Sequence, residues 1–277
     1  MGSVNFLQLI LGILLAAVVA FVAFRLRSLS RSGAIGAFVL GAVVFGFGGL
    51  PWACVLLVFF VTSSGLSGLM KRRKKKIEAQ FAKSSRRDAW QVAANGGVAG
   101  LAALLGVFFP HSIFPWVLFA AALAAANADT WATELGVLSK GWPRSIRSFR
   151  QVSPGTSGGI SLMGTLAAAA GAAAIALTTR LVWPTSFPAN MERWSFALII
   201  FAAGLIGSLV DSLLGATVQG IYNCPVCDKE TEKHPKHTCG NKTVLIRGWK
   251  WMNNDVVNLA CTGSAAMIAF IWVALLQ

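Results

Sequence analysis

Long apolar runs separated by short polar segments dominate the pattern of hydrophobic and polar positions along the chain. Most runs contain about 18 to 22 residues, the length that an α-helix needs to cross roughly 30 Å of hydrocarbon. Glycine, proline and clustered charges mark the ends of the runs. The pattern predicts eight transmembrane spans, at residues 6–24, 33–48, 51–69, 90–109, 114–138, 157–178, 196–221 and 254–276. We therefore expect an all-α, polytopic helical membrane protein in which residues 1–277 form a single integral membrane domain.

The second span, residues 33–48, leaves the number of spans open. This segment is short and rich in glycine, a residue that allows helix backbones to approach closely. It is expected either to cross the membrane or to form a tilted or re-entrant pair with the span at 51–69. A count of seven spans is therefore the alternative to eight.

Lysine and arginine are confined to alternate loops. Of the 24 such residues in the chain, 22 lie in four loops, and the exceptions are Arg180 and Arg193. The four loops are residues 25–32, 70–89, 139–156 and 222–253. Because basic loops remain on the cytoplasmic side of a membrane, we expect these loops to face the cytoplasm and both termini to face outward.

The net charge of +14 therefore reflects membrane topology. The basic run at residues 71–76 has no interleaved aromatic residues, so membrane lipids are the expected partner of this run and nucleic acid is not. Residues 1–5 lack the basic segment of a cleavable signal peptide. Together with the short loops, this favours the inner membrane of a prokaryote. Nothing in the pattern indicates an oligomeric state.

Polar residues that are energetically unfavourable inside a membrane lie near the cytoplasmic ends of the predicted spans. An ionised carboxylate at the centre of a membrane helix costs about 2.5 to 3.5 kcal/mol on insertion scales, so such groups usually have a partner or a function. A shared site is favoured over separate helix caps, although a cap remains the alternative for Asp255. The candidates are Asn95, Asn127, Asp129, Glu134, Asp211, Asn254, Asp255 and Asn258.

The segment "NADTWATELG", residues 127–136, carries two acids with different orientations. At 100° per residue, Asp129 shares a helix face with Thr133, whereas Glu134 lies toward another face. Asp211 lies among small residues of the seventh span, which allow a neighbouring helix to come close. If that neighbour carries Asp129, two carboxylates meet, and Mg²⁺ prefers one or two carboxylates together with phosphate oxygens. We therefore predict a Mg²⁺ site at Asp129 and Asp211, with Asp255 as a possible third contact.

The segment "SPGTSGGIS", residues 153–161, contains the start of the predicted sixth span. Its glycines allow the backbone to approach an anion, and the start of a helix attracts negative charge. Lys140 and Arg144 in the preceding loop can neutralise phosphate. The candidate contacts are Gly155, Thr156, Ser157, Gly158 and Gly159, although a plain helix cap explains this segment equally well when it is considered alone.

The loop at residues 222–253, between the last two spans, contains a metal-binding pattern. Cys224 and Cys227 form a Cys-x2-Cys pair, and His237 and Cys239 follow nine residues later. This spacing is typical of a tetrahedral structural Zn²⁺ site, with His234 as a competing ligand. A disulfide is disfavoured because the loop is expected to face the reducing cytoplasm. We therefore predict a small cytoplasmic zinc-binding loop.

Six motifs resemble the transmembrane protein 19 family, whose plant members include the phytyl-phosphate kinase of the tocopherol pathway. They are "FFVTSSGLSGLMKRRKKK", "RDAWQVAANGGV", "NADTWATELGVLSKGWPRSI", "VSPGTSGGISLMG", "GSLVDSLLGATVQG" and "NNDVVNL". The resemblance extends from about residue 30 to the last span. It implies transfer of a phosphoryl group from a nucleoside triphosphate to an isoprenyl monophosphate, such as phytyl or geranylgeranyl phosphate, to give the diphosphate.

A more distant likeness connects the chain to phytol and dolichol kinases, in which an acidic helix precedes a Ser/Thr-Gly segment. Those enzymes favour CTP, so CTP is the expected donor, with another nucleoside triphosphate as the alternative. Where they carry a lysine before that segment, this chain has Ser153-Pro154-Gly155, so Lys140 or Arg144 is expected to supply the charge. Phosphoryl transfer needs positioning and Mg²⁺ more than a strong base.

These expectations assign a role to each candidate. Asp129 and Asp211 bind the metal ion, Glu134 orients Lys140 or Arg144, and the asparagines contact phosphate or nucleotide. Two other classes of protein remain as alternatives, a membrane transporter and a non-catalytic lipid-phosphate-binding protein. A transporter usually places its site near the bilayer midplane, whereas the polar residues of this chain gather at one side.

Overall fold

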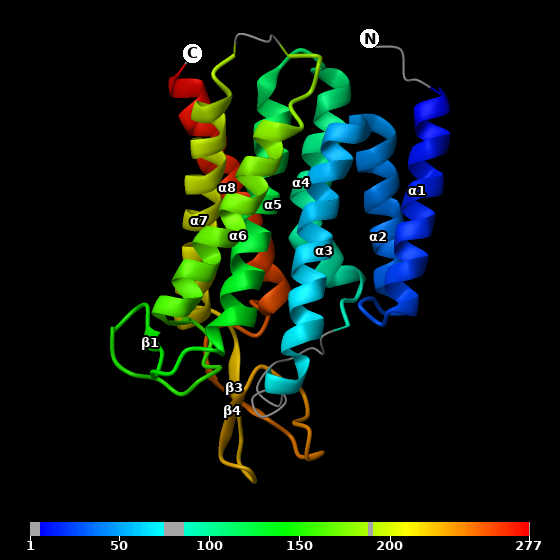
Figure 1. Cartoon of the computed structure of the whole chain (residues 1–277). Helices are drawn as coiled ribbons and strands as arrows, with labels where there is room; N and C mark the ends of the chain where they lie inside the picture. Colours follow the sequence, from blue (N-terminus) through cyan, green and yellow to red (C-terminus); the bar gives the residue numbers. More distant parts are fainter. Residues whose placement is uncertain (1–5, 75–85, 188–190, 277) are drawn as a thin grey trace.

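The computed structural model describes residues 6–74, 86–187 and 191–276. This part of the chain is predominantly helical, which confirms the predicted fold class, and Figure 1 shows its long helices as one bundle. The helices are α1 (Phe6–Arg25), α2 (Arg31–Val43), α3 (Gly49–Lys74), α4 (Ala89–Phe108), α5 (Ile113–Gly136), α6 (Leu162–Leu181), α7 (Arg193–Thr217) and α8 (Asn254–Leu275). Residues 75 and 76 of the basic run at 71–76, and the side chains of the whole run, lie outside the described part of the chain.

Seven helical segments of the described chain are long and apolar enough to cross a membrane. One of them, Arg31–Met70, has 40 residues and contains both α2 and α3. A π-helical turn, Val44–Gly48, and Gly49 with a φ of +74° separate these two helices, and the chain reverses its direction there (Figure 1). The seven segments therefore contain eight helices, as the hydrophobic pattern predicts.

Two of the predicted helix boundaries that differ from the structure lie at the covered end of the bundle. The sixth helix begins at Leu162 rather than at residue 157, because Ser161 is its N-cap and accepts a hydrogen bond from the Gly164 amide. Gly158 has a φ of +78°, which is incompatible with a right-handed helix. The seventh helix ends at Thr217 rather than at residue 221, because the chain enters a β-strand at Ile221.

Helix α5 forms the centre of the bundle and contacts α3, α4, α6, α7 and α8. Trp116, Val117 and Phe119 are completely buried in it. Small residues bring its neighbours close: a Cβ atom on Gly171 of α6 would lie 2.9 Å from the Asn127 carbonyl oxygen, and one on Gly204 of α7 would lie 2.6 Å from the Ala124 Cβ. The acids near the C-terminal end of α5 are therefore carried by a tightly packed, rigid helix.

Two small sheets cover one end of the bundle (Figure 1). The first pairs β1 (Arg144–Ser145) with β2 (Gly159–Ile160) in the loop between α5 and α6. The second lies between α7 and α8 and has the order β4-β3-β5, formed by β3 (Ile221–Cys224), β4 (Lys229–Thr231) and β5 (Val244–Arg247). Both sheets lie at the end of the bundle where α5 and α7 finish and α4, α6 and α8 begin.

Candidate functional site

A cavity of about 950 Å³ lies between this end of the bundle and the loops that cover it. The structure brings most of the predicted site residues together in its lining, from four helices and the loop before α6. They are Asn95, Asp129, Glu134, Gly155, Thr156, Ser157, Gly158, Gly159, Asp211, Asn254, Asp255 and Asn258. Residues far apart in the sequence therefore meet at one polar site.

Asp129 of α5 and Asp211 of α7 lie next to each other in this cavity, close enough for a hydrogen bond when one carboxyl group carries a proton. Asp211 Oδ2 is buried and has no hydrogen-bond partner among the residues that the structure describes. Two adjacent carboxylates with an unsatisfied buried oxygen suit a hard divalent cation such as Mg²⁺.

Asp255 also lines the cavity, but it does not complete a three-carboxylate group. In the described part of the chain, one group of at least three potential metal ligands has all its ligand atoms within 4.8 Å, and Asp255 is not in it. The geometry therefore brings Asp129 and Asp211 together, and the third contact at Asp255 stays a prediction. Glu232 approaches Asp211 from the loop after α7 and adds negative charge there.

Glu134 also lines the cavity, where it contacts α3. Ser67 Oγ of α3 donates a hydrogen bond of 2.8 Å to Glu134 Oε1, and the guanidinium group of Arg87 lies nearby. Burial lowers the pKa of Arg87, and the negative charge of Glu134 raises it in compensation. The sequence-based role of Glu134, orienting Lys140 or Arg144, is thus corrected: Glu134 is paired with Ser67 and Arg87.

The backbone of Arg87 is fixed just before α4. Its amide donates to the Ser28 carbonyl at 3.0 Å, and its carbonyl accepts from the Ser30 amide at 2.9 Å. Gly33 packs directly against the Arg87 carbonyl, so no side chain fits at that position of α2. Sequence reasoning missed Arg87 because it treated the whole basic loop as a topology signal.

Three predicted contacts do not line the cavity. Asn127 is completely buried, where its amide nitrogen donates to the Gly171 carbonyl and its oxygen accepts from Thr62 Oγ1. Lys140 is exposed, and Arg144 points to the Phe149 carbonyl within its own exposed loop. Four other cations line the cavity instead, namely Arg87, Lys233, Lys236 and Lys250.

The glycine-rich loop before α6 packs on the end of α7. A Cβ atom on Gly158 would collide with the backbone of Ala216, so the two segments are in direct contact. Ser157 Oγ donates to Gln219 Oε1 at 2.7 Å, and Gln219 Nε2 donates to Glu232 Oε1 at 2.9 Å. Residues 155–159 are therefore a wall of the cavity, joined through Gln219 to the loop after α7, and not the first turn of a helix.

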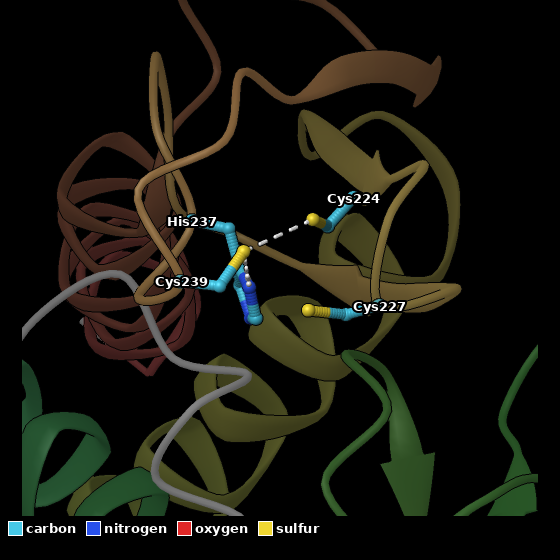
Figure 2. Close-up of side chains that lie close together, drawn as sticks. All are labelled: Cys224, Cys227, His237 and Cys239. Atoms are coloured by element: carbon cyan, nitrogen blue, oxygen red, sulfur yellow. Dashed lines mark hydrogen bonds between the residues drawn. The ribbon is translucent and has the colours of Figure 1, made fainter.

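The four residues of the predicted metal-binding pattern converge in space (Figure 2). Cys224 Sγ lies 3.5 Å and His237 Nδ1 lies 3.2 Å from Cys239 Sγ, and all four ligand atoms lie within 4.8 Å of one another. A Zn–S bond of about 2.3 Å in a tetrahedron places sulfur atoms about 3.8 Å apart, so the spacing fits a metal ion. This group could therefore hold a metal ion.

Hydrogen bonds in and around the group shift the pKa values of two of its thiols in opposite directions. The pKa of Cys239 is lowered to about 5, first by the Asn241 side chain and then by the Asn241 backbone and His237, which favours the thiolate that binds metal. The pKa of Cys227 is raised to about 11, mainly by its hydrogen bond with Cys239. The competing ligand, His234, is not in the group; its ring stacks on Tyr222 instead.

Comparisons with known proteins agree with this architecture. The family model described as integral membrane protein DUF92 matches residues 14–266. Protein PGR of Arabidopsis thaliana is 31% identical over 268 residues, covering 91% of each chain. An uncharacterised membrane protein of Methanocaldococcus jannaschii is 34% identical over 223 residues, covering 78% of this chain and 87% of its own.

A more divergent relative is Protein VTE6, chloroplastic, of Arabidopsis thaliana, which is 23% identical over 247 residues, covering 88% of this chain and 65% of its own. No solved structure matches the chain at a significant level. The matches confirm the resemblance that the six sequence motifs indicate. The chain therefore belongs to the family of integral membrane proteins described as DUF92.

Proposed function

We propose that this protein is a nucleoside-triphosphate-dependent kinase that converts an isoprenyl monophosphate to the diphosphate at the membrane surface. One observation carries the proposal: the charged cavity adjoins a small apolar cavity, and Arg87, Gln91 and Asn95 line both. A substrate with a phosphate head and a hydrocarbon tail requires such a junction. The resemblance to the transmembrane protein 19 family, which includes the phytyl-phosphate kinase of plants, supports the same reaction.

The apolar cavity lies among α1, α2, α3 and α4. Besides the three shared residues, its lining is entirely apolar and includes Leu40, Phe45 and Phe59. The cavity measures about 50 Å³, so it takes only the first carbon atoms of an isoprenyl chain; the rest of the chain stays in the bilayer, while the phosphate reaches the guanidinium group of Arg87. Phytyl and geranylgeranyl phosphate are substrates of this chemical class.

Charge neutralisation is the main task of the site, because both the phosphate acceptor and the nucleotide are anions. The acceptor oxygen is already ionised, so no strong base is required. Arg87 holds the lipid phosphate. Its Nη1 donates to Ser63 Oγ at 3.1 Å, and the negative charge of Glu134, which accepts from Ser67, stabilises its guanidinium group. A Mg²⁺ ion bound by Asp129 and Asp211 would neutralise charge on the transferred phosphoryl group. Asn95, Asn254 and Asn258 supply polar contacts around the phosphates.

The remaining assignments follow from the same proposal. The Cys224, Cys227, His237 and Cys239 group holds a structural Zn²⁺, and His237 Nε2 hydrogen-bonds to Thr238 Oγ1, as the outer nitrogen of a histidine ligand usually does. CTP is the favoured donor, on the likeness to phytol and dolichol kinases. The charge pattern of the loops orients the cavity toward the cytoplasm, in a prokaryotic inner membrane.

A transporter and a non-catalytic lipid-phosphate-binding protein are the alternatives. The cavity lies at one end of the bundle, whereas a transporter site usually lies near the midplane. A protein that only binds lipid phosphate does not need a pair of adjacent carboxylates beside the phosphate site, because they repel it. The paired acids therefore favour the kinase.

Purified protein tests the proposal directly. Phytyl phosphate or geranylgeranyl phosphate is incubated with Mg²⁺ and either CTP or ATP, and the lipid product is separated from the substrate. The proposal predicts a lipid diphosphate and an equal amount of nucleoside diphosphate. Binding of the lipid phosphate without turnover, under every nucleotide, would contradict the kinase and support the binding protein.

A further inference from the structure

The loop that carries the metal-binding group also forms one wall of the charged cavity. Seven residues of this loop, residues 222–253, line the cavity: Tyr222, Glu232, Lys233, His234, Lys236, Lys250 and Asn253. This wall carries aromatic and charged side chains, whereas the adjoining apolar cavity, beyond the shared Arg87, Gln91 and Asn95, is lined by aliphatic and phenyl side chains. The two walls therefore suit ligands of different chemistry.

An aromatic pair stands in this wall. The rings of Tyr222 and His234 are stacked, with centroids 4.6 Å apart and planes at 15°. Tyr222 is buried and covers one face of the imidazole, whereas His234 as a whole is exposed at the cavity. Bases of nucleotides stack on such rings with little dependence on sequence or base identity.

Two lysines flank the aromatic pair on a rigid segment. The carbonyl of Lys233 accepts from Thr243 Oγ1 at 3.0 Å, and the carbonyl of Pro235 accepts from the Thr243 amide at 3.1 Å. The backbones of Lys236 and Lys242 form an isolated antiparallel β-bridge. These backbone contacts hold Lys233 and Lys236 at the cavity, where their ammonium groups can neutralise a polyphosphate.

One strand, β3, carries both a residue of the metal-binding group and a residue of the cavity wall. Tyr222 and Cys224 both belong to β3, and Tyr222 and Cys224 pair with Thr231 and Lys229 of β4. His237 follows directly after the segment that carries Lys233 and His234. A metal ion bound by Cys224 and His237 would therefore connect the strand that carries Tyr222 with the segment that carries Lys233 and His234.

We infer that the metal-bound loop is the nucleoside triphosphate site, with the base stacked on His234 and the phosphates bound by Lys233 and Lys236. This inference rests on the proposed kinase function, because it assigns the donor to one wall of the cavity and the lipid acceptor to Arg87 at another. It gives the metal-binding loop a direct part in substrate recognition.

Nucleotide binding in the absence of lipid substrate tests the inference. Full-length purified protein is titrated with Mg·CTP and with Mg·ATP, and the dissociation constants are measured for wild type, His234→Ala, His234→Phe and the double variant Lys233→Gln with Lys236→Gln. The matched controls are His111→Ala, in the loop between α4 and α5, and Lys229→Gln, an exposed residue of β4 that does not line the cavity. Metal content and melting temperature verify that each variant is folded.

His234→Ala and the double lysine variant should each weaken nucleotide binding by about tenfold or more, as expected for loss of one stacked base or of two phosphate contacts. His234→Phe should retain most of the affinity, and the controls should bind as wild type does. The KM for the nucleotide should rise in the same variants while the KM for the lipid phosphate stays unchanged.

Four outcomes separate this inference from the proposed function. Unchanged affinity in the folded variants, with an active wild-type kinase, overturns the inference alone. Loss of affinity in the variants, with a wild type that binds nucleotide but transfers no phosphate, supports the inference and overturns the kinase. A wild type that binds no nucleotide overturns both. Loss of affinity with an active wild type supports both.

Discussion

Asp129 and Asp211 lie side by side at one end of the bundle, although they come from different helices, α5 and α7. Small residues permit the contact: Gly204 and Gly207 of α7 pack against Ala124 and Ala125, one turn before Asp129. Two carboxylates in contact repel each other unless a proton or a cation lies between them. This pair is the geometric basis of the proposed Mg²⁺ site.

Arg87→Lys should weaken recognition of the lipid phosphate while it preserves the charge. Lysine cannot donate to Ser63, face Glu134 and bind a phosphate through a planar group at the same time. We expect the KM for the lipid phosphate to rise about tenfold, or about 1.4 kcal/mol, with a smaller effect on the KM for the nucleotide. Arg86→Lys is the matched control because Arg86 is exposed and does not line the cavity. Equal effects of both variants would contradict the role of Arg87.

Gly158→Ala should disrupt the wall before α6. Its φ of +78° costs a non-glycine residue about 1 to 3 kcal/mol, and the added Cβ atom collides with the Ala216 backbone. We expect a lower melting temperature and loss of turnover. Gly97→Ala in α4 is the control, because its Cβ atom meets nothing within 4 Å and alanine favours helix. A fully stable and active Gly158→Ala protein would show that the tight contact with α7 is not required.

The metal-binding group should hold about one Zn²⁺ per chain, measured by elemental analysis of protein purified without chelator. Cys224→Ser should lose the metal and lower the melting temperature, because a ligand of the tetrahedral set is removed. Cys54→Ser in α3 should keep both, since Cys54 is remote from the group. Metal-free wild-type protein with full activity would leave the convergence of the four ligands without a function.

Cysteine labelling tests the orientation of the bundle. A cysteine that replaces Ser85, in the basic loop outside the described residues, should react with an impermeant maleimide only after the membrane is permeabilised. A cysteine that replaces His111, in the exposed loop between α4 and α5, should react in intact cells. Labelling of the Ser85 position in intact cells would place the cavity on the outer side and contradict access to cytoplasmic nucleotide.

The sequence predicts those features that depend on local pattern. Helix α5 is long and apolar enough to be recognised from its length alone, and the Cys-x2-Cys pair with the later His-x-Cys is a complete ligand set within sixteen residues of chain. The small residues around Asp211 predict a close helix neighbour, and the structure supplies α5 in that position.

Features that depend on tertiary contacts are not predictable in this way. Arg87 and Lys140 are both basic loop residues in the sequence, yet pairing with Ser28 and Ser30 directs one toward the cavity while the other stays exposed. Ser157 and Ser161 are both plausible N-caps, and the positive φ of Gly158 decides between them. Such choices are made by packing partners from distant parts of the chain.

Turnover and melting temperature of Asp129→Asn and Asp211→Asn, measured on the same preparations, test the paired-acid metal site most directly. Each change removes one negative charge with little change in volume. The proposed site predicts folded, stable proteins whose phosphoryl transfer is slower by two or more orders of magnitude, about 3 kcal/mol or greater in activation free energy. Full activity in a stable Asp129→Asn or Asp211→Asn protein, or loss of activity only in step with loss of stability, would contradict it.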